Sequence, residues 1–251
     1  MHKPKKRIDV ITIIRILLLI VIIVSLTALV MQLWEYKKGT DSYNNLRTQV
    51  VQTQPQQEDS QQPEEFHVDF ADLQSKNPDI IGWLAFDSVD ISYPVLYSGD
   101  NSYYLRRLWD KSYNQAGSLF LEGNNKGLDD LHAIVYGHNM KNGSMFAPLK
   151  QYLKQEFYQQ NGGWFTLYTP EATWRYQIFS VHQADPQDQL YTVGFSEGEQ
   201  YTEFVKMLKD SSIYDTGIEV SPDDHVLTLS TCTDDGQQRI VVHARRAEQV
   251  E

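Results

Sequence analysis

The sequence predicts a mostly β domain that follows a single transmembrane helix. The helix is indicated by an uncharged apolar run over residues 16–31, with basic residues before it. The β domain is indicated by a series of short β-like segments after residue 80, separated by turn signals and accompanied by few helical segments. Many short strands with few helices favour a β-barrel or a mixed sheet over alternating strand–helix units.

Residues 8–33 are predicted to form a transmembrane signal-anchor helix. A spanning helix needs about 20 mostly apolar residues, and only Asp9 and Arg15 carry charge in this stretch. Four basic residues precede it, so the positive-inside rule places residues 1–7 in the cytoplasm as a basic tail and the bulk of the chain outside the cell. A cleaved signal peptide is the alternative, but no small-x-small cleavage site follows the run.

Residues 34–65 are predicted to be a polar linker, and residues 66–251 one extracellular catalytic domain. The stretch 49–65 holds seven glutamines and two prolines with almost nothing to bury, which is typical of a flexible tether. Whether residues 36–48 continue the helix is left open. Predicted strands cover 81–86, 93–96, 118–121, 132–136, 164–168, 173–184, 225–230 and 239–244, and helices cover 145–158 and 201–209.

The charge and the cysteine count narrow the function classes. The formal net charge is -11, although five basic residues stand against one acidic residue in the first fifteen. The body of the chain is therefore acidic and would repel a phosphate backbone, so nucleic acid is not expected as a partner. No metal-ligand spacing of cysteines and histidines is present, and neither a metal nor a cofactor is predicted.

Three residues at strand ends are candidates for acyl-transfer chemistry. His138 follows an apolar strand that ends in Gly137, Cys232 is the only cysteine and ends another strand, and Arg239 starts the next strand. If the last two strands form a hairpin, Cys232 and Arg239 face each other. A thiolate can attack a carbonyl, an imidazole can move protons, and a guanidinium can stabilise the developing oxyanion.

These motifs, in this order, resemble the sortase family. Thr228-Leu-Ser-Thr-Cys232 resembles its TLxTC strand, with the Gly-His upstream and the arginine downstream. Several stretches are similar to class B sortases in particular, and the similarity extends over about residues 66–246. These stretches are Asn77-Pro-Asp-Ile-Ile-Gly-Trp-Leu84, Tyr93-Pro-Val, Asp100-Asn-Ser-Tyr-Tyr-Leu105, Tyr136-Gly-His-Asn-Met-Lys-Asn-Gly-Ser-Met-Phe146 and Val241-Val-His-Ala.

The resemblance implies an eight-stranded sortase-type β-barrel with a few short helices. It implies a membrane-anchored cysteine transpeptidase of Gram-positive bacteria, which cleaves a C-terminal sorting motif of surface proteins after its Thr through a thioester. By analogy Cys232 is the nucleophile, His138 the general acid/base, and Arg239 the ligand of the substrate carbonyl and oxyanion. Class B sortases usually place this arginine eight or more residues after the cysteine, so a gap of seven implies a shorter loop. The implied substrate-binding residues are Asn101, Leu105, Ser230 and Thr231.

The resemblance leaves several alternatives open. The implied partners are a sorting-signal peptide and an acceptor amine, which belongs either to a peptidoglycan precursor or to a pilin; the lack of a lid motif favours wall anchoring over pilin polymerisation. A non-catalytic membrane-anchored scaffold or adhesin is the alternative from another class. Arg245 and Arg246 are rivals of Arg239, and Asp234 either orients His138 or is a loop carboxylate, the reading we favour.

Overall fold

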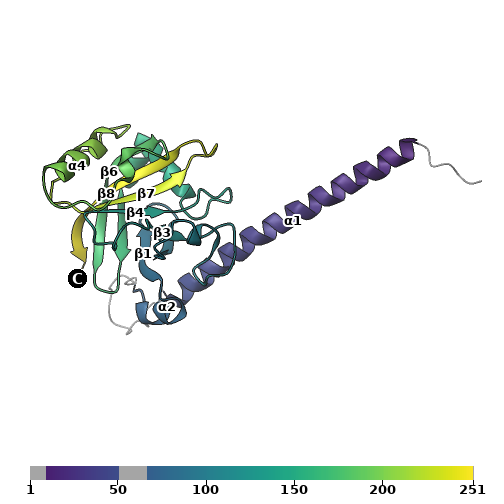
Figure 1. Cartoon of the computed structure of the whole chain (residues 1–251), viewed down its shortest axis with the longest axis horizontal. Coiled ribbons are helices and arrows are strands. Elements are labelled where there is room, and N and C mark those ends of the chain that lie inside the picture. Colours follow the sequence, from purple (N-terminus) through teal and green to yellow (C-terminus); the bar gives the residue numbers. More distant parts are fainter. Residues whose placement is uncertain (1–9, 51–66, 251) are drawn as a thin grey trace, which may run out of the picture. The chain divides into compact units, whose positions relative to one another are not determined.

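The predicted eight-stranded β-barrel is confirmed in the computed structural model, which describes residues 10–50 and 67–250 (Figure 1). Within these residues the strands close in the order β1-β2-β3-β4-β7-β8-β6-β5. Neighbours pair antiparallel except for β2 with β3 and β4 with β7, which are parallel. The strands are β1 Ile80–Phe86, β2 Ser92–Leu96, β3 Leu119–Leu121, β4 His132–Tyr136, β5 Trp164–Tyr168, β6 Thr173–Ala184, β7 Val226–Cys232 and β8 Arg239–Val250.

Short helices fill the connections between the strands. The segment predicted as one helix over 145–158 is instead two short ones, because the extended backbone of Lys154 (φ -104, ψ 116) ends the first and begins the second. The short α-helices are α2 Phe70–Lys76, α3 Gln155–Asn161 and α4 Glu199–Asp210, and the 3₁₀ helices are η1 Tyr103–Arg106, η2 Ala147–Leu153 and η3 Gln189–Tyr191.

Strand β7 lies between two hydrophobic clusters, which explains why its sequence is apolar or small almost throughout. Leu227 and Leu229 belong to the cluster inside the barrel, whereas Val226 packs outside it with residues of α4. Successive side chains of a strand point to opposite faces. Ser230 and Cys232 are therefore on the outer face of the barrel wall, at the end of β7.

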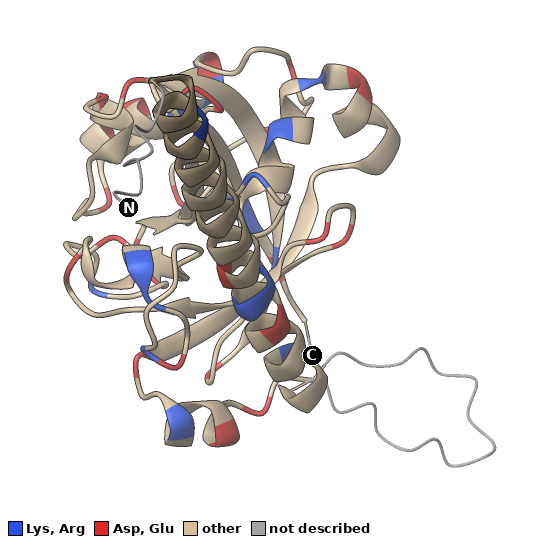
Figure 2. Cartoon of the chain, turned by 90° about the vertical axis from the view of Figure 1, so that its right-hand side faces the viewer, with Lys and Arg blue, Asp and Glu red and all other residues tan. Residues whose placement is uncertain are grey.

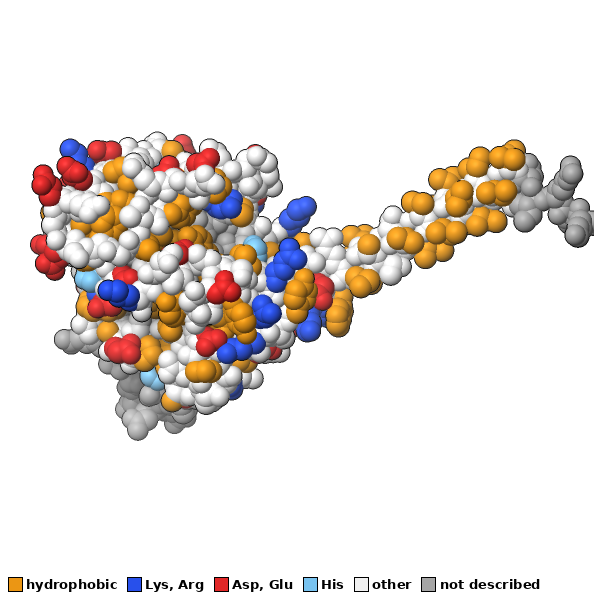
Figure 3. Space-filling view, viewed as in Figure 1, with side chains coloured by type: hydrophobic (Ala, Val, Ile, Leu, Met, Phe, Trp, Pro, Cys, Tyr) orange, Lys and Arg blue, Asp and Glu red, His pale blue; other side chains and the backbone are white. Residues whose placement is uncertain are grey.

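Helix α1, Val10–Val50, belongs to two units of the chain. The first unit ends at Lys38, and its helical part carries exposed apolar side chains from Val10 to Trp34 (Figure 3). This stretch is long and apolar enough to cross a membrane, a property that signal sequences share. The predicted cytoplasmic tail, residues 1–7, lies outside the described residues, as do residues 51–65 of the predicted linker.

The last three turns of α1 belong to the same compact unit as the barrel. This unit begins at Gly39. Tyr43, Leu46 and Val50 are buried in its hydrophobic clusters. The Tyr43 hydroxyl donates to the carbonyl oxygen of Gly117 at 2.6 Å. The sequence left residues 36–48 undecided within a predicted linker of 34–65, whereas the structure continues the helix through them to Val50.

Charged residues of both signs are interspersed over the globular unit (Figure 2). Several of them form ion pairs at the surface, such as Arg175 with Asp87 at 2.6 Å and Lys209 with Glu219 at 2.7 Å. Exposed pairs of this kind contribute about 0–1 kcal/mol each. The barrel is therefore held together by its apolar clusters and backbone ladders rather than by surface charge.

Candidate active site

All seven residues that the sequence predicted for catalysis and substrate binding line one cavity of about 230 Å³ at the ends of β4 and β7. The cavity thus brings together segments that are more than a hundred residues apart in the chain. Five further residues complete its wall. The predicted residues are Asn101, Leu105, His138, Ser230, Thr231, Cys232 and Arg239, and the additional ones are Phe120, Tyr136, Gly137, Pro186 and Tyr191.

Cys232 and Arg239 are direct partners in the antiparallel ladder of β7 and β8. The loop between them is closed by a bond from the Thr233 amide to the Gln238 carbonyl at 3.0 Å, and Gly236 adopts the positive φ of 73° that the turn requires. Among the described residues, no carboxylate lies within ion-pair distance of the Arg239 guanidinium, which bonds only to the Gln238 carbonyl at 3.2 Å. Its remaining N–H groups are available to a ligand in the cavity.

His138 is placed by the continuation of the β4–β7 pairing beyond β4. The Gly137 amide donates to the Ser230 carbonyl at 3.1 Å, and a Cβ at Gly137 would lie 2.5 Å from a side-chain atom of Leu119. The His138 Nε2 lies 2.7 Å from the carbonyl oxygen of Leu105. Because a carbonyl oxygen only accepts, Nε2 carries the hydrogen in this bond, and Nδ1 is left for proton exchange.

Asp234 contacts Asn139 and not His138. The Asn139 Nδ2 donates to the Asp234 Oδ1 at 2.9 Å and to the Cys232 carbonyl at 2.9 Å, and Lys150 lies 3.6 Å from the same carboxylate oxygen. Asp234 is therefore a loop carboxylate, the reading favoured from the sequence. Asn139 is a site residue that the sequence analysis did not single out, although the Gly-His-Asn-Met motif contains it.

Strand β7 contributes Ser230 and Thr231 to the lining of the cavity beside the thiol. The Ser230 hydroxyl lies 3.0 Å from the hydroxyl of Tyr191, and burial raises the pKa of Tyr191, which keeps this phenol protonated at neutral pH. The Thr231 Oγ1 is buried and has no hydrogen-bond partner among the described residues. Tyr191 was not predicted from the sequence, because nothing local connects η3 to β7.

The opposite wall is organised by Glu122, a buried carboxylate behind the cavity. Its Oε2 accepts from the Asn101 Nδ2 at 2.7 Å and from the Tyr136 hydroxyl at 2.9 Å. The Asn101 Oδ1 in turn accepts from the Gly123 amide at 2.7 Å. These bonds fix the Asn101 amide, so that one of its N–H hydrogens remains for a ligand. This role was not predicted, because Glu122 begins a stretch with the residue pattern of a turn.

The rival arginines lie away from the cavity. Arg245 pairs with Asp224 at 3.8 Å, and Arg246 pairs with Asp129 at 2.7 Å and stacks over the ring of Trp174. Both therefore have partners of their own, in the middle of β8 and six or more residues beyond Arg239. No group of three or more metal-ligating side chains occurs in the ranges 10–50 and 67–250.

Comparison with known proteins matches residues 84–247 to the sortase domain. This chain belongs to the sortase family. It is 35% identical over 162 residues to a protein named Sortase B from Listeria monocytogenes, covering 64% of this chain and 65% of that protein. It is 28% identical to Sortase B of Staphylococcus aureus, covering 94% and 96% of the two chains. A solved structure described as a Staphylococcus aureus sortase B–substrate complex matches with a TM-score of 0.75 at 26% identity, covering 87% of this chain and all of that one.

These relatives confirm the class B sortase resemblance that the motifs indicated. Sortases are cysteine transpeptidases. The one cysteine of this chain, Cys232, lines the cavity described above. The short gap between Cys232 and Arg239 is accommodated in this sortase by the six-residue loop 233–238, without loss of the pairing between the two residues.

Proposed function

We propose that this sortase cleaves the C-terminal sorting motif of surface proteins after its Thr and transfers the product to an amine. The observation that carries the proposal is that Cys232, His138 and Arg239 line one cavity of an eight-stranded barrel that matches those of sortases. The arrangement supplies a nucleophile, a proton carrier and a fixed positive charge, which are the groups that acyl transfer needs.

In the first half-reaction the Cys232 thiolate attacks the carbonyl carbon of the Thr in the sorting motif. The negative charge moves to the carbonyl oxygen, where the free N–H groups of Arg239 donate to it. As the tetrahedral intermediate collapses, the C–N bond breaks and His138 gives the proton on Nδ1 to the leaving amine. The Thr carbonyl is then held as a thioester on Cys232, and the C-terminal fragment departs.

In the second half-reaction an acceptor amine attacks the thioester carbon. His138 Nδ1 takes a proton from the attacking nitrogen, Arg239 again donates to the oxyanion, and the Cys232 thiolate leaves as the new amide forms. The acceptor we propose is a peptidoglycan precursor, so that the reaction anchors proteins to the cell wall. Support for anchoring over pilin polymerisation comes from the absence of a lid motif in the sequence before the barrel.

The peptide is proposed to lie between the two walls of the cavity. Ser230 and Thr231 would contact it beside the thiol, and Leu105 and Asn101 would contact it on the opposite side. The free N–H hydrogen of Asn101 suits a backbone carbonyl of the peptide. Thr231 would contact the peptide without its hydroxyl, because the Oγ1 atom is buried.

The membrane topology is part of the proposal. Residues 8–33 would anchor the chain, with residues 1–7 in the cytoplasm and the catalytic domain of residues 66–251 outside the cell. The turns of α1 from Gly39 to Val50 would then be extracellular and part of the folded catalytic unit. Support comes from the length and composition of α1 and from the basic residues that precede it.

The direct test uses the fragment 36–251 with two fluorogenic peptides, one of the Asn-Pro-x-Thr type and one of the Pro-x-Thr-Gly type. An amine acceptor is added, and Cys232→Ala is the matched control. We expect one peptide to be cleaved between Thr and the next residue, with the acceptor joined to the Thr in the wild type alone. If neither peptide is cleaved while the fragment is folded, a non-catalytic scaffold becomes the better account.

A further inference from the structure

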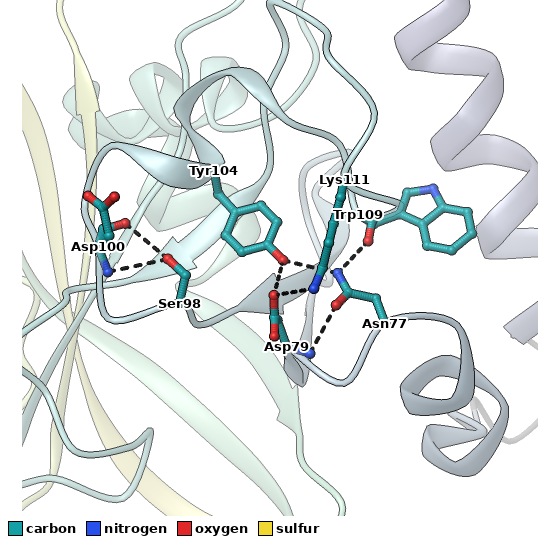
Figure 4. Close-up of polar contacts among 7 residues, drawn as sticks. All are labelled: Asn77, Asp79, Ser98, Asp100, Tyr104, Trp109 and Lys111. Carbon is teal, nitrogen blue, oxygen red and sulfur yellow. Dashed lines mark hydrogen bonds and ion pairs between the residues drawn. The ribbon is translucent and has the colours of Figure 1, made fainter.

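The motif Asn77-Pro-Asp lies between α2 and β1 and has no part in the chemistry described so far. It forms a cluster with Tyr104 and Lys111 (Figure 4). The Tyr104 hydroxyl donates to the Asp79 Oδ2 at 2.6 Å and accepts from the Asn77 Nδ2 at 3.1 Å. The Lys111 Nζ lies 2.8 Å from the same Asp79 oxygen. The Tyr104 hydroxyl, from η1, is thus held by Asn77 and Asp79, which precede β1.

The cluster is rigid because its polar groups are occupied. The Asn77 Nδ2 also donates to the Trp109 carbonyl at 2.6 Å, and its Oδ1 accepts from the Asp79 amide at 3.0 Å. Pro78 disfavours a helical conformation at Asn77, which accordingly has the extended φ of -148° that ends α2. The local sequence therefore presents the Asn77 amide toward Tyr104.

The charges of the cluster favour a neutral tyrosine that donates to a carboxylate. Burial acts to raise the pKa of Asp79, but hydrogen bonds from Lys111 and Tyr104 outweigh it, and the pKa is lowered overall. Burial also raises the pKa of Tyr104, whose side chain is fully buried. At neutral pH the Tyr104 hydroxyl therefore keeps its proton and the Asp79 carboxylate its charge.

Tyr104 is followed by Leu105, whose carbonyl oxygen holds His138. Both residues belong to the 3₁₀ helix η1. Besides the contacts of the Tyr104 hydroxyl with the cluster, this helix is held by a hydrogen bond from the Ser118 amide to the Tyr104 carbonyl at 3.1 Å. Behind it, Gly117 has a φ of +59°, and a Cβ there would lie 2.6 Å from the Leu105 oxygen. The Leu105 carbonyl therefore has little freedom to move, and it lies 2.7 Å from the His138 Nε2.

We propose that the cluster of Asn77, Asp79 and Lys111, acting through Tyr104, positions the His138 imidazole by fixing the Leu105 carbonyl. The cluster does not line the cavity, so its members are positioning residues and not catalytic ones. This inference rests on the role proposed above for His138. The Asn77-Pro-Asp motif would thereby help to keep the His138 imidazole in the position from which it exchanges protons during the reaction at Cys232.

The test uses the full chain in detergent micelles and the variant Tyr104→Phe. This substitution removes the hydroxyl but keeps the buried ring. Tyr201→Phe is the matched control, because Tyr201 is equally buried and its hydroxyl makes two bonds, to the carbonyls of Leu131 and Asp224, away from the cavity. Asp79→Asn is a milder variant, since an amide oxygen can still accept from Tyr104 while the ion pair with Lys111 is lost.

The first readout is the pH dependence of Cys232 alkylation by iodoacetamide, which needs no peptide substrate. Cys232 is the only thiol in the chain, so the label is unambiguous. The other titratable side chains that line the cavity are Tyr136, Tyr191 and Arg239, and none of them bonds to the cluster. We expect the profile of Tyr104→Phe to move toward that of His138→Ala, with Asp79→Asn in between and Tyr201→Phe unchanged.

The second readout is peptide turnover. A misplacement of about 1 Å can lower a rate about a hundredfold, so we expect kcat of Tyr104→Phe to fall by about ten- to a hundredfold with KM nearly unchanged. If the wild type shows no turnover, the proposed function fails, whereas the alkylation profiles still decide this inference. The inference is overturned if Tyr104→Phe keeps the wild-type profile, or if His138→Ala itself leaves the profile unchanged.

Discussion

Acid should destabilise this sortase through the buried histidines His132 of β4 and His243 of β8. His132 of β4 is fully buried, with Nδ1 2.7 Å from the Thr192 carbonyl and Nε2 2.7 Å from the Thr228 hydroxyl. The same hydroxyl lies 2.7 Å from the His243 Nδ1. Since the carbonyl only accepts, Nδ1 of His132 carries the hydrogen in that bond. The Thr228 hydroxyl has a single hydrogen, which it can donate either to Nε2 of His132 or to Nδ1 of His243, so burial rather than the bonds disfavours a charged His132.

The size of the effect follows from the His132 pKa. Burial lowers this pKa from 6.5 to about 4, while the Thr192 carbonyl and Asp130 act in the opposite direction. The folded-state value lies below the unfolded one, so the two states bind equal numbers of protons above pH 6.5. Below that pH the unfolded chain takes up the proton first, and stability falls until about pH 4. At about 1.4 kcal/mol per pH unit, this single group accounts for about 3 kcal/mol.

The measurement is urea unfolding of the fragment 36–251 at a series of pH values, for the wild type and for His132→Gln. The variant should be less stable at neutral pH but lose less on acidification, so the gap between the two should narrow by up to about 3 kcal/mol. His67→Gln, at an exposed histidine, should run parallel to the wild type. Parallel curves for the wild type and His132→Gln would show that His132 is not held neutral by the fold.

Further changes have equally specific expected outcomes. Arg239→Ala should lower kcat/KM by about 10²–10³, as expected for loss of one oxyanion donor, whereas Arg245→Ala should keep most of the activity; the reverse ranking in the peptide assay would show that the wrong arginine was chosen. Glu122→Gln should raise KM several-fold with little change in kcat, because it loosens Asn101 and not the thiol; an unchanged KM would contradict that role. A fragment that begins at residue 66 should be less stable to urea than 36–251 by several kcal/mol, because it lacks the buried side chains of residues 39–50, each of which contributes about 1.5–3 kcal/mol; equal midpoints would mean that the end of α1 adds nothing.

The sequence was sufficient for the barrel because its signals are local. Alternating and apolar runs between turn residues marked each strand to within a few residues, including β4 and β7. The prediction failed at the end of β8, which continues from Ala244 to Val250. This extension is polar, and it forms because β6 pairs with it, for example Arg175 with Glu248. A polar two-sided ladder has no hydrophobic period by which it could be recognised.

The features that the sequence did not reveal depend on contacts between distant segments. The end of α1 is ordered by the bond of Tyr43 to Gly117, which lies 74 residues away. Asn139 meets Asp234 across 95 residues, and Glu122 meets Asn101 across 21. Residue type and spacing identified the reactive groups Cys232 and His138, since chemistry restricts which side chains can serve. The groups that orient them are restricted only by geometry, so the fold was needed to find them.

The most direct test of the account is intact-protein mass spectrometry of the fragment 36–251 mixed with the cleaved peptide type and no acceptor amine. We predict a covalent adduct equal to the peptide up to and including its Thr, located on Cys232, removed by hydroxylamine and absent from Cys232→Ala. Cleavage without such an adduct, or an adduct that persists in Cys232→Ala, would contradict a thioester on this cysteine.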